Sequence, residues 1–195
     1  MSKQQGSVEV ICGSMFSGKT EELIRRLRRA QYAKQKIQVF KPILDNRYAG
    51  DAVVSHEGFT IECIALDRAH HILYLLSPDT DVVGIDEIQF FEEDIIEVVQ
   101  ELADRGKRVL CAGLDQDFTA KGFGPMPQLL AIAEKVDKIQ AICMQCGDDA
   151  SRTHKIAGSS SQVEVGEKEL YEARCRSCHK GAAKSEKQKQ FSFIE

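Results

Sequence analysis

The sequence predicts an α/β fold in which a parallel sheet is flanked by helices, with a small zinc-binding domain at the C-terminal end. Three observations lead to this prediction. Short apolar segments alternate with amphipathic helical segments. A phosphate-binding motif connects the first apolar segment to the first helical segment, and two pairs of cysteines lie near the C-terminus. Strands that alternate with helices form parallel sheets, and ligands bind at the carboxyl ends of such strands.

The phosphate-binding motif runs from Gly13 to Thr20 and has the form G-x-x-x-x-G-K-[ST]. Its glycines, Gly13 and Gly18, let backbone N–H groups turn inward around an anion. Lys19 is expected to reach the terminal phosphates of ATP, and the Thr20 hydroxyl to coordinate Mg²⁺. The other members of this predicted site are Ser14, Met15, Phe16 and Ser17. An apolar strand at 7–12 precedes the motif and a helix at 21–31 follows it, so a P-loop NTPase-like sheet is predicted.

The rest of the main domain continues the alternation. Strands are predicted at 36–41, 81–87, 109–114 and 136–142, and helices at 68–76, 92–104 and 126–133. Between 53 and 66 the pattern is ambiguous, and a hairpin around Glu57-Gly58 is one interpretation. We place a domain boundary after residue 142, which gives an α/β domain at 1–142 and a zinc-binding domain with a polar tail at 143–195.

Composition points to a soluble protein. Of the 195 residues, 43% are hydrophobic and 29% charged, and no apolar run is long enough to span a membrane. Without a signal-peptide core near the start, a cytoplasmic location is expected. The net charge of −4 argues against a general nucleic-acid-binding surface. The arginines of 25–29 are interpreted as a solvated helix face, with Glu21 and Glu22 four residues before Arg25 and Arg26.

Two carboxylates, Asp86 and Glu87, close the strand predicted at 81–87. A Mg²⁺ ion on a nucleotide needs a carboxylate from a neighbouring strand, and Asp86 is placed to supply it. Glu87 can then accept the proton of an attacking hydroxyl group or water molecule. The alternative is that Glu87 is a surface carboxylate without a chemical role.

Four cysteines form two C-x-x-C pairs, Cys143 with Cys146 and Cys175 with Cys178. Two such pairs can complete a closed tetrahedral Zn²⁺ site. Two disulfides or redox dithiols are the alternatives, and His179 could replace Cys178 as a ligand. The other three cysteines, Cys12, Cys63 and Cys111, lie in apolar contexts typical of a buried core.

Taken together, these motifs resemble those of the type II thymidine kinases, the zinc-containing thymidine kinases of bacteria and animal cells. The resemblance covers nearly the whole chain. It rests on the phosphate loop, Lys41-Pro42, Asp45-Asn46-Arg47-Tyr48, Asp86-Glu87-Ile88-Gln89-Phe90-Phe91, Gly113-Leu114-Asp115-Gln116-Asp117-Phe118, Phe123-Gly124, both cysteine pairs, Val163-Glu164-Val165-Gly166 and Tyr171.

The resemblance implies transfer of the ATP γ-phosphate to the 5′-hydroxyl of thymidine. It implies that Glu87 is the general base, that Asp86 acts with magnesium, and that Arg47 joins Lys19 at the phosphate-transfer site. The implied phosphate-binding set also includes Ile88 and Gln89. Feedback inhibition by thymidine triphosphate and a homotetramer are implied as well, with no nucleic-acid or membrane partner.

In the family, the loop between the cysteine pairs folds over the nucleoside as a lasso whose ends the zinc holds. The implied lasso contacts are Val163, Glu164, Val165, Gly166 and, at the loop's return, Tyr171. The other residues implied to line the nucleoside pocket are Met15, Phe90, Leu114, Phe118, Phe123 and Thr153. On this interpretation the phosphate loop lies in the other domain, so loss of a zinc ligand is expected to weaken thymidine binding far more than ATP binding.

Two other functions compete with this interpretation. A P-loop ATPase or GTPase would use water where a nucleoside hydroxyl is expected, although no guanine-specificity motif is present. A nucleic-acid-binding module could instead be built on the cysteine pairs, but basic and aromatic residues are not interleaved near them.

Overall fold

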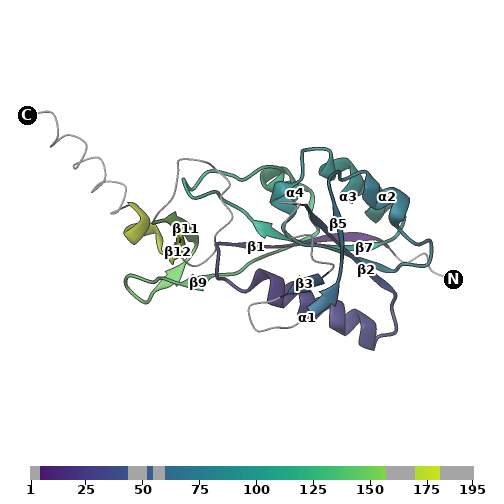
Figure 1. The fold of residues 1–195 in the computed structure, drawn as a ribbon, viewed down its shortest axis with the longest axis horizontal. Helices are drawn as coiled ribbons and strands as arrows, with labels where there is room; N and C mark the ends of the chain where they lie inside the picture. The colour runs from purple at the N-terminus through teal and green to yellow at the C-terminus, as the bar shows by residue number, and fades with distance from the viewer. Residues whose placement is uncertain (1–4, 44–51, 55–59, 157–169, 181–195) are drawn as a thin grey trace, which may run out of the picture.

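A parallel six-stranded sheet forms the centre of the computed structural model, which describes residues 5–43, 52–54, 60–156 and 170–180 (Figure 1). The strands, in their order across the sheet, are β5 (Ile64–Leu66), β2 (Ile37–Pro42), β6 (Val82–Ile85), β7 (Arg108–Leu114), β1 (Ser7–Gly13) and β8 (Lys135–Lys138). Every neighbouring pair in this sheet is parallel. The predicted fold class is therefore confirmed.

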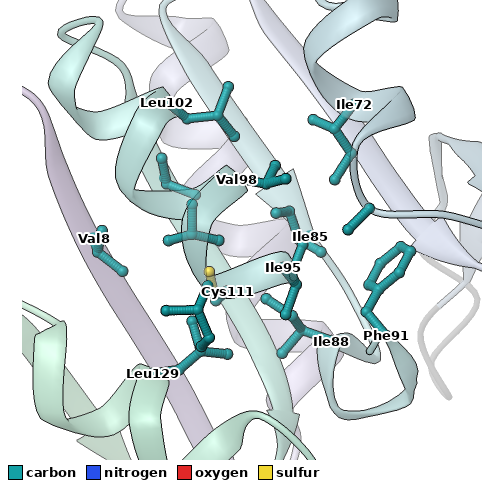
Figure 2. Close-up of a cluster of buried hydrophobic side chains, with 14 of the residues drawn as sticks. Val8, Ile72, Ile85, Ile88, Phe91, Ile95, Val98, Leu102, Cys111 and Leu129 are labelled. Atoms are coloured by element: carbon teal, nitrogen blue, oxygen red, sulfur yellow. The ribbon is translucent and has the colours of Figure 1, made fainter. Parts of the chain in front are cut away.

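Helices cover both faces of the sheet, so its central strands are apolar on both sides. One face packs against α1 (Lys19–Tyr32), which contributes Leu23 and Leu27 to a cluster with Ile11 of β1. The other face packs against α2 (His71–Leu75), α3 (Ile95–Asp104) and α4 (Met126–Ile132) (Figure 1). Figure 2 shows this second cluster, in which Ile85 and Cys111 of the sheet face Ile95 and Val98 of α3.

The ambiguous region around residues 53–66 forms two different structures. The strands β3 (Ala52–Val54) and β4 (Thr60–Glu62) pair antiparallel, with Val54 opposite Thr60, so the predicted hairpin is confirmed. Its proposed tip, Glu57-Gly58, lies outside the described residues. The strand β5 was not predicted, because its three residues are too few to show a periodic pattern.

The strand predicted at 136–142 is in fact two strands. The first, β8, follows β1 until the Ile139 N–H donates to the Cys12 carbonyl at 2.8 Å. Within the described parts of the chain its pairing with β1 ends at Cys12, because β1 turns into the phosphate loop at Gly13. The chain therefore leaves the sheet, and β9 (Ala141–Ile142) pairs with β10 (Asp149–Ala150). The strands β11 (Arg152–Lys155) and β12 (Tyr171–Arg174) form a further antiparallel pair.

Arg26 does not lie on a solvated helix face, and the interpretation of 25–29 is wrong at this position. Its side chain is 8% exposed and points from α1 toward the sheet. It donates to Glu9 at 2.9 Å, to Glu22 at 2.8 Å and to Asp137 at 2.7 Å. Arg108 donates to the other oxygen of Glu9 at 2.6 Å. The network ties α1 to β1, β7 and β8, because Arg26 lies on α1, Glu9 on β1, Arg108 on β7 and Asp137 on β8.

This network predicts that Arg26→Met destabilises the fold by about 3 kcal/mol, because the buried Glu9 carboxylate loses one of its two cations. Arg25→Met is the matched control: its side chain is 59% exposed, so loss of its solvent-screened pair with Glu22 should lower the stability far less. Urea unfolding of both variants measures the difference. Equal losses would contradict the structural role of Arg26.

The same network predicts a pH dependence. Burial raises the pKa of Glu9, but the hydrogen bonds and charges of Arg108 and Arg26 outweigh it and lower the pKa overall. The stabilisation is therefore complete above the unfolded-state pKa and is lost as the pH falls through the folded-state value. The difference in free energy of unfolding between the wild type and Arg26→Met, measured by urea unfolding, should accordingly shrink as the pH is lowered.

Candidate active site

The phosphate loop leaves β1 and enters α1 through two glycines that meet different constraints. Gly13 has φ 151°, and a Cβ there would lie 2.2 Å from the Ile139 carbonyl oxygen. Gly18, the N-cap of α1, has φ 83°, and a Cβ there would make only an ordinary contact with Glu21 Oε2 at 3.7 Å, so its backbone angle rather than crowding calls for glycine. Phe16 also has a left-handed backbone, at φ 64°. These angles wrap the loop around the N-terminus of α1, where anions bind favourably.

Lys19 and Thr20 carry polar groups from the start of α1 to the carboxyl end of the sheet. The Lys19 ammonium donates to the Ser14 carbonyl at 2.9 Å, as does the Ser17 hydroxyl at 2.8 Å. Burial lowers the pKa of Lys19, while the charges of Glu87 and Asp86 raise it. Lys19 is thus a partly buried ammonium group close to two carboxylates, at the end of the predicted phosphate loop.

Asp86 lies directly after β6, and the Thr20 hydroxyl donates to its Oδ2 at 3.2 Å. Burial, followed by the charge of Glu87, raises the pKa of Asp86 to about 7. A buried carboxylate in this state is stabilised by a cation. A hydroxyl and a carboxylate are also the oxygen ligands that Mg²⁺ prefers, so Thr20 and Asp86 fit the ion predicted from the sequence.

Glu87 occupies a backbone conformation that is uncommon for a residue with a side chain. Its φ is 51°, and its N–H donates to Asp86 Oδ1 at 3.0 Å. Immediately afterwards the chain forms the 3₁₀ turn η1 (Ile88–Phe90), and Gln89 Nε2 donates to Glu87 Oε2 at 2.5 Å. Non-glycine residues held at positive φ occur frequently at functional sites.

The residues implied to line the nucleoside pocket fall into three contacting groups. The Met15 N–H donates to the Thr153 hydroxyl at 3.0 Å. Phe90 and Phe123 meet edge to face with ring centroids 5.4 Å apart. The Lys155 ammonium lies 5.1 Å from the Phe118 ring and 5.6 Å from the Tyr171 ring. The remaining pocket residue, Leu114, ends β7 and donates its N–H to Gln89.

Five residues that the resemblance implies for the site lie outside the described residues. These are Arg47, Val163, Glu164, Val165 and Gly166. Their roles remain predictions.

Sequence reasoning assigned no role to Asp115 and Lys138. Asp115 follows β7 as Asp86 follows β6, and that shared position is the signal that could have drawn attention to it. It is 5% exposed, and its Oδ2 pairs with the Lys138 ammonium from the far side of β1. Among the described residues its Oδ1 has no hydrogen-bond partner.

The four cysteine sulfurs converge as predicted, all within 4.8 Å of one another. Ligands 2.3 Å from a tetrahedral zinc ion lie about 3.8 Å apart. The Cys146 and Cys175 sulfurs are 3.7 Å apart, whereas a disulfide needs about 2.05 Å. Burial raises the pKa of Cys143, but backbone N–H groups of Cys175, Gln145 and Cys146 lower it to about 6. The cluster could therefore hold a zinc ion.

His179 is turned away from this cluster. Its Nε2 lies 3.0 Å from the Phe118 carbonyl oxygen, which can only accept, so the nitrogen donates. The described geometry therefore uses Cys178 rather than His179 as the fourth member of the cluster.

The phosphate loop contacts the part of the chain that carries the cysteines. The Ser14 hydroxyl donates to the Ala150 carbonyl at 3.3 Å, and Met15 bonds to Thr153 as described above. Phe16 packs against the apolar cluster that includes Cys143 and Cys175. The phosphate loop and the cysteine-bearing part of the chain are therefore in direct contact.

None of the helices in the described parts of the chain combines the length and apolar character needed to cross a membrane. The family model for thymidine kinase matches residues 6–179, which include the phosphate loop, both carboxylates after β6 and all four clustered cysteines. The chain therefore belongs to the thymidine kinase family, the kinases that transfer a phosphate group to thymidine.

Proposed function

We propose that this protein transfers the γ-phosphate of ATP to the 5′-hydroxyl of thymidine, giving thymidine monophosphate and ADP. The observation that supports it best is the hydrogen bond between Thr20 and Asp86. It brings the phosphate loop on β1 and the carboxylates after β6 together at one edge of the sheet, although β7 lies between the two strands.

The phosphate loop binds and orients the donor. Backbone N–H groups at the start of α1 face the phosphates, and Lys19 moves its ammonium from the Ser14 carbonyl to a phosphate oxygen. Thr20 and Asp86 would hold Mg²⁺, which neutralises charge on the phosphates when it is bound. Arg47 would add a further cation at the transfer site.

Glu87 accepts the proton in the transfer step. The thymidine 5′-oxygen forms a bond to the γ-phosphorus while the bond between that phosphorus and the bridging oxygen of ATP breaks. The electron pair of the broken bond stays on the bridging oxygen, which leaves as part of ADP. The 5′-hydroxyl proton passes to the Glu87 carboxylate. The left-handed backbone at Glu87 and its contact with Gln89 hold that carboxylate in a fixed orientation before substrate arrives.

Thymidine would be bound along β11, which contacts the phosphate loop through Thr153 and the loop after β7 through Lys155. Met15 and Phe118 would supply apolar surface there, and Thr153 a hydroxyl group. The Tyr171 ring lies on the same Lys155 ammonium as the Phe118 ring. The segment 163–166 would close over the base. A closed lid excludes water, which protects the γ-phosphate from hydrolysis.

The resemblance extends the proposal to the whole assembly. A structural Zn²⁺ ion would be held by Cys143, Cys146, Cys175 and Cys178, without a vacant position for a substrate. The enzyme would be a cytoplasmic homotetramer that thymidine triphosphate inhibits.

The first prediction is that ATP turnover depends on thymidine. Purified protein with Mg²⁺ should convert thymidine and ATP to thymidine monophosphate and ADP in equal amounts, measured by chromatography, with adenosine as the control nucleoside. Consumption of ATP at the same rate without any nucleoside would identify a hydrolase instead.

Glu87→Gln keeps the shape of the side chain but removes the proton acceptor, so turnover should fall by about 10²–10⁴-fold. The affinities for ATP and thymidine should change little. Glu92→Gln, at an exposed carboxylate five residues away, is the matched control and should stay near wild-type turnover. A Glu87→Gln enzyme that turns over like this control would remove Glu87 from the mechanism.

Elemental analysis should find one zinc ion per chain, and Cys178→Ser should lose it. Because Ser14 and Met15 contact the cysteine-bearing part, this variant should bind both thymidine and ATP more weakly in calorimetric titrations. Ser177→Ala changes an exposed residue between two of the cysteines and should keep the metal and both affinities. Loss of thymidine binding alone would mean that the cluster serves only the loop between the cysteine pairs.

A further inference from the structure

Gln89 connects Glu87 to the end of the neighbouring strand. It is 2% exposed, and its amide reaches in two directions. Nε2 donates to Glu87 Oε2 at 2.5 Å, and Oε1 accepts from the Leu114 N–H at 3.0 Å. The Leu114 N–H can only donate, so the amide oxygen must face it and the NH₂ group must face Glu87. The orientation of the amide is thereby fixed.

The register of the sheet explains why a side chain is needed here. Ile85, the last residue of β6, is level with Cys111, whereas β7 continues for three more residues to Leu114. Beyond Ile85, none of the described strands lies beside β7 on that flank, and without Gln89 its last N–H would lack a partner among the described residues. The Gln89 side chain supplies that partner and carries the connection on to Glu87.

Two glycines make room for the Gln89 amide and its backbone, and buried neighbours hold the turn η1 that carries Gln89. A Cβ at Gly113 would lie 2.5 Å from Gln89 Oε1, and one at Gly124 would lie 2.5 Å from the Gln89 carbonyl oxygen. On either side of Gln89, Ile88 and Phe91 are buried in the large apolar cluster (Figure 2). The turn is therefore held rigidly, and Gln89 can transmit its position to Glu87.

We infer that Gln89 is a positioning residue for the transfer reaction, which holds the Glu87 carboxylate in register with the end of β7. This inference rests on the proposed function, since it deepens the role of Glu87. The Leu114 end of the bridge lies at the root of the loop that carries Phe118 and Phe123. Nucleoside bound against that loop would thus meet a carboxylate whose orientation is set from the same strand.

The inference is tested with Gln89→Met, which keeps the length of the side chain but removes both hydrogen bonds. The turnover number should fall by about 10–100-fold, because a misplaced catalytic group loses that much, while KM for thymidine and ATP stays within about threefold. In a Glu87→Gln background the same change should cost less than about threefold, because the group that Gln89 positions is already gone.

The matched control is Gln38→Met. Gln38 also joins separate segments through its amide, to Leu75, Ser77 and Thr80, but it lies away from Glu87. This variant should lower stability without changing turnover. If Gln89→Met does not fold, Gly113→Ala provides a second test. The added methyl group pushes the Gln89 amide out of place without removing it, and the loss of turnover should again be smaller in the Glu87→Gln background.

Two kinetic results would overturn the inference: unchanged turnover in Gln89→Met, or an equal loss in the wild-type and Glu87→Gln backgrounds. A wild-type protein without thymidine kinase activity would instead overturn the proposed function. Urea unfolding of the wild type, Gln89→Met, Glu87→Gln and the double variant tests the contact between Gln89 and Glu87 independently of activity. Non-additive unfolding midpoints are expected for Gln89 and Glu87, and additive ones would show that the two side chains do not act together.

Discussion

The alignment of the parallel strands is the constraint on which the rest of this structure depends. Parallel pairing places the carboxyl ends of β6, β7 and β1 at one edge, with Gly13 level with Leu114 and Ile85 level with Cys111. The phosphate loop, the two carboxylates and the root of the Phe118 loop each begin where one of these strands ends. Chemistry from three distant parts of the sequence therefore meets because the apolar strands must pair and be covered on both faces.

The same edge is reinforced by contacts that cross it. Thr20 reaches Asp86 from α1, Gln89 reaches Leu114 from the turn after β6, and Lys138 reaches Asp115 from the far side of β1. Each contact joins two segments that, within the described residues, no backbone hydrogen bond of the sheet connects at this edge. Polar groups in such buried positions are costly unless they are paired, so the contacts hold the site in one arrangement.

The cysteine cluster is joined to this edge rather than appended to it. Ser14 and Met15 bond to the segment around β10 and β11, and Phe16 packs on the cluster itself. His179, next to Cys178, bonds to Phe118 in the loop after β7. The phosphate loop therefore packs on the cysteine cluster through Phe16, and the loop after β7 bonds to the residue next to Cys178.

Sequence reasoning predicted the elements that local pattern determines. The phosphate loop between β1 and α1, the carboxylates after β6 and the convergence of the four cysteines follow from motif and spacing. It was wrong about Arg26, because its partners Glu9 and Asp137 are distant in sequence and only the packed sheet brings them together. The strands β5 and β9 are too short for periodicity, and they exist because of their neighbours.

The bridge through Gln89 was hidden for a related reason. It depends on the three-residue offset between the ends of β6 and β7, and a register of that kind cannot be seen in one strand alone. The division into domains at residue 142 remains a prediction, as do the roles of Arg47 and of residues 163–166, which lie outside the described residues.

A crystal structure with thymidine, Mg²⁺ and a non-hydrolysable ATP analogue tests the central claim most directly. The account predicts that the thymidine 5′-oxygen lies within about 2.6–3.2 Å of a Glu87 carboxylate oxygen, and in line with the terminal phosphate on the loop from Gly13 to Thr20. A 5′-oxygen bound beside a different carboxylate, with Glu87 turned away from it, would contradict the account.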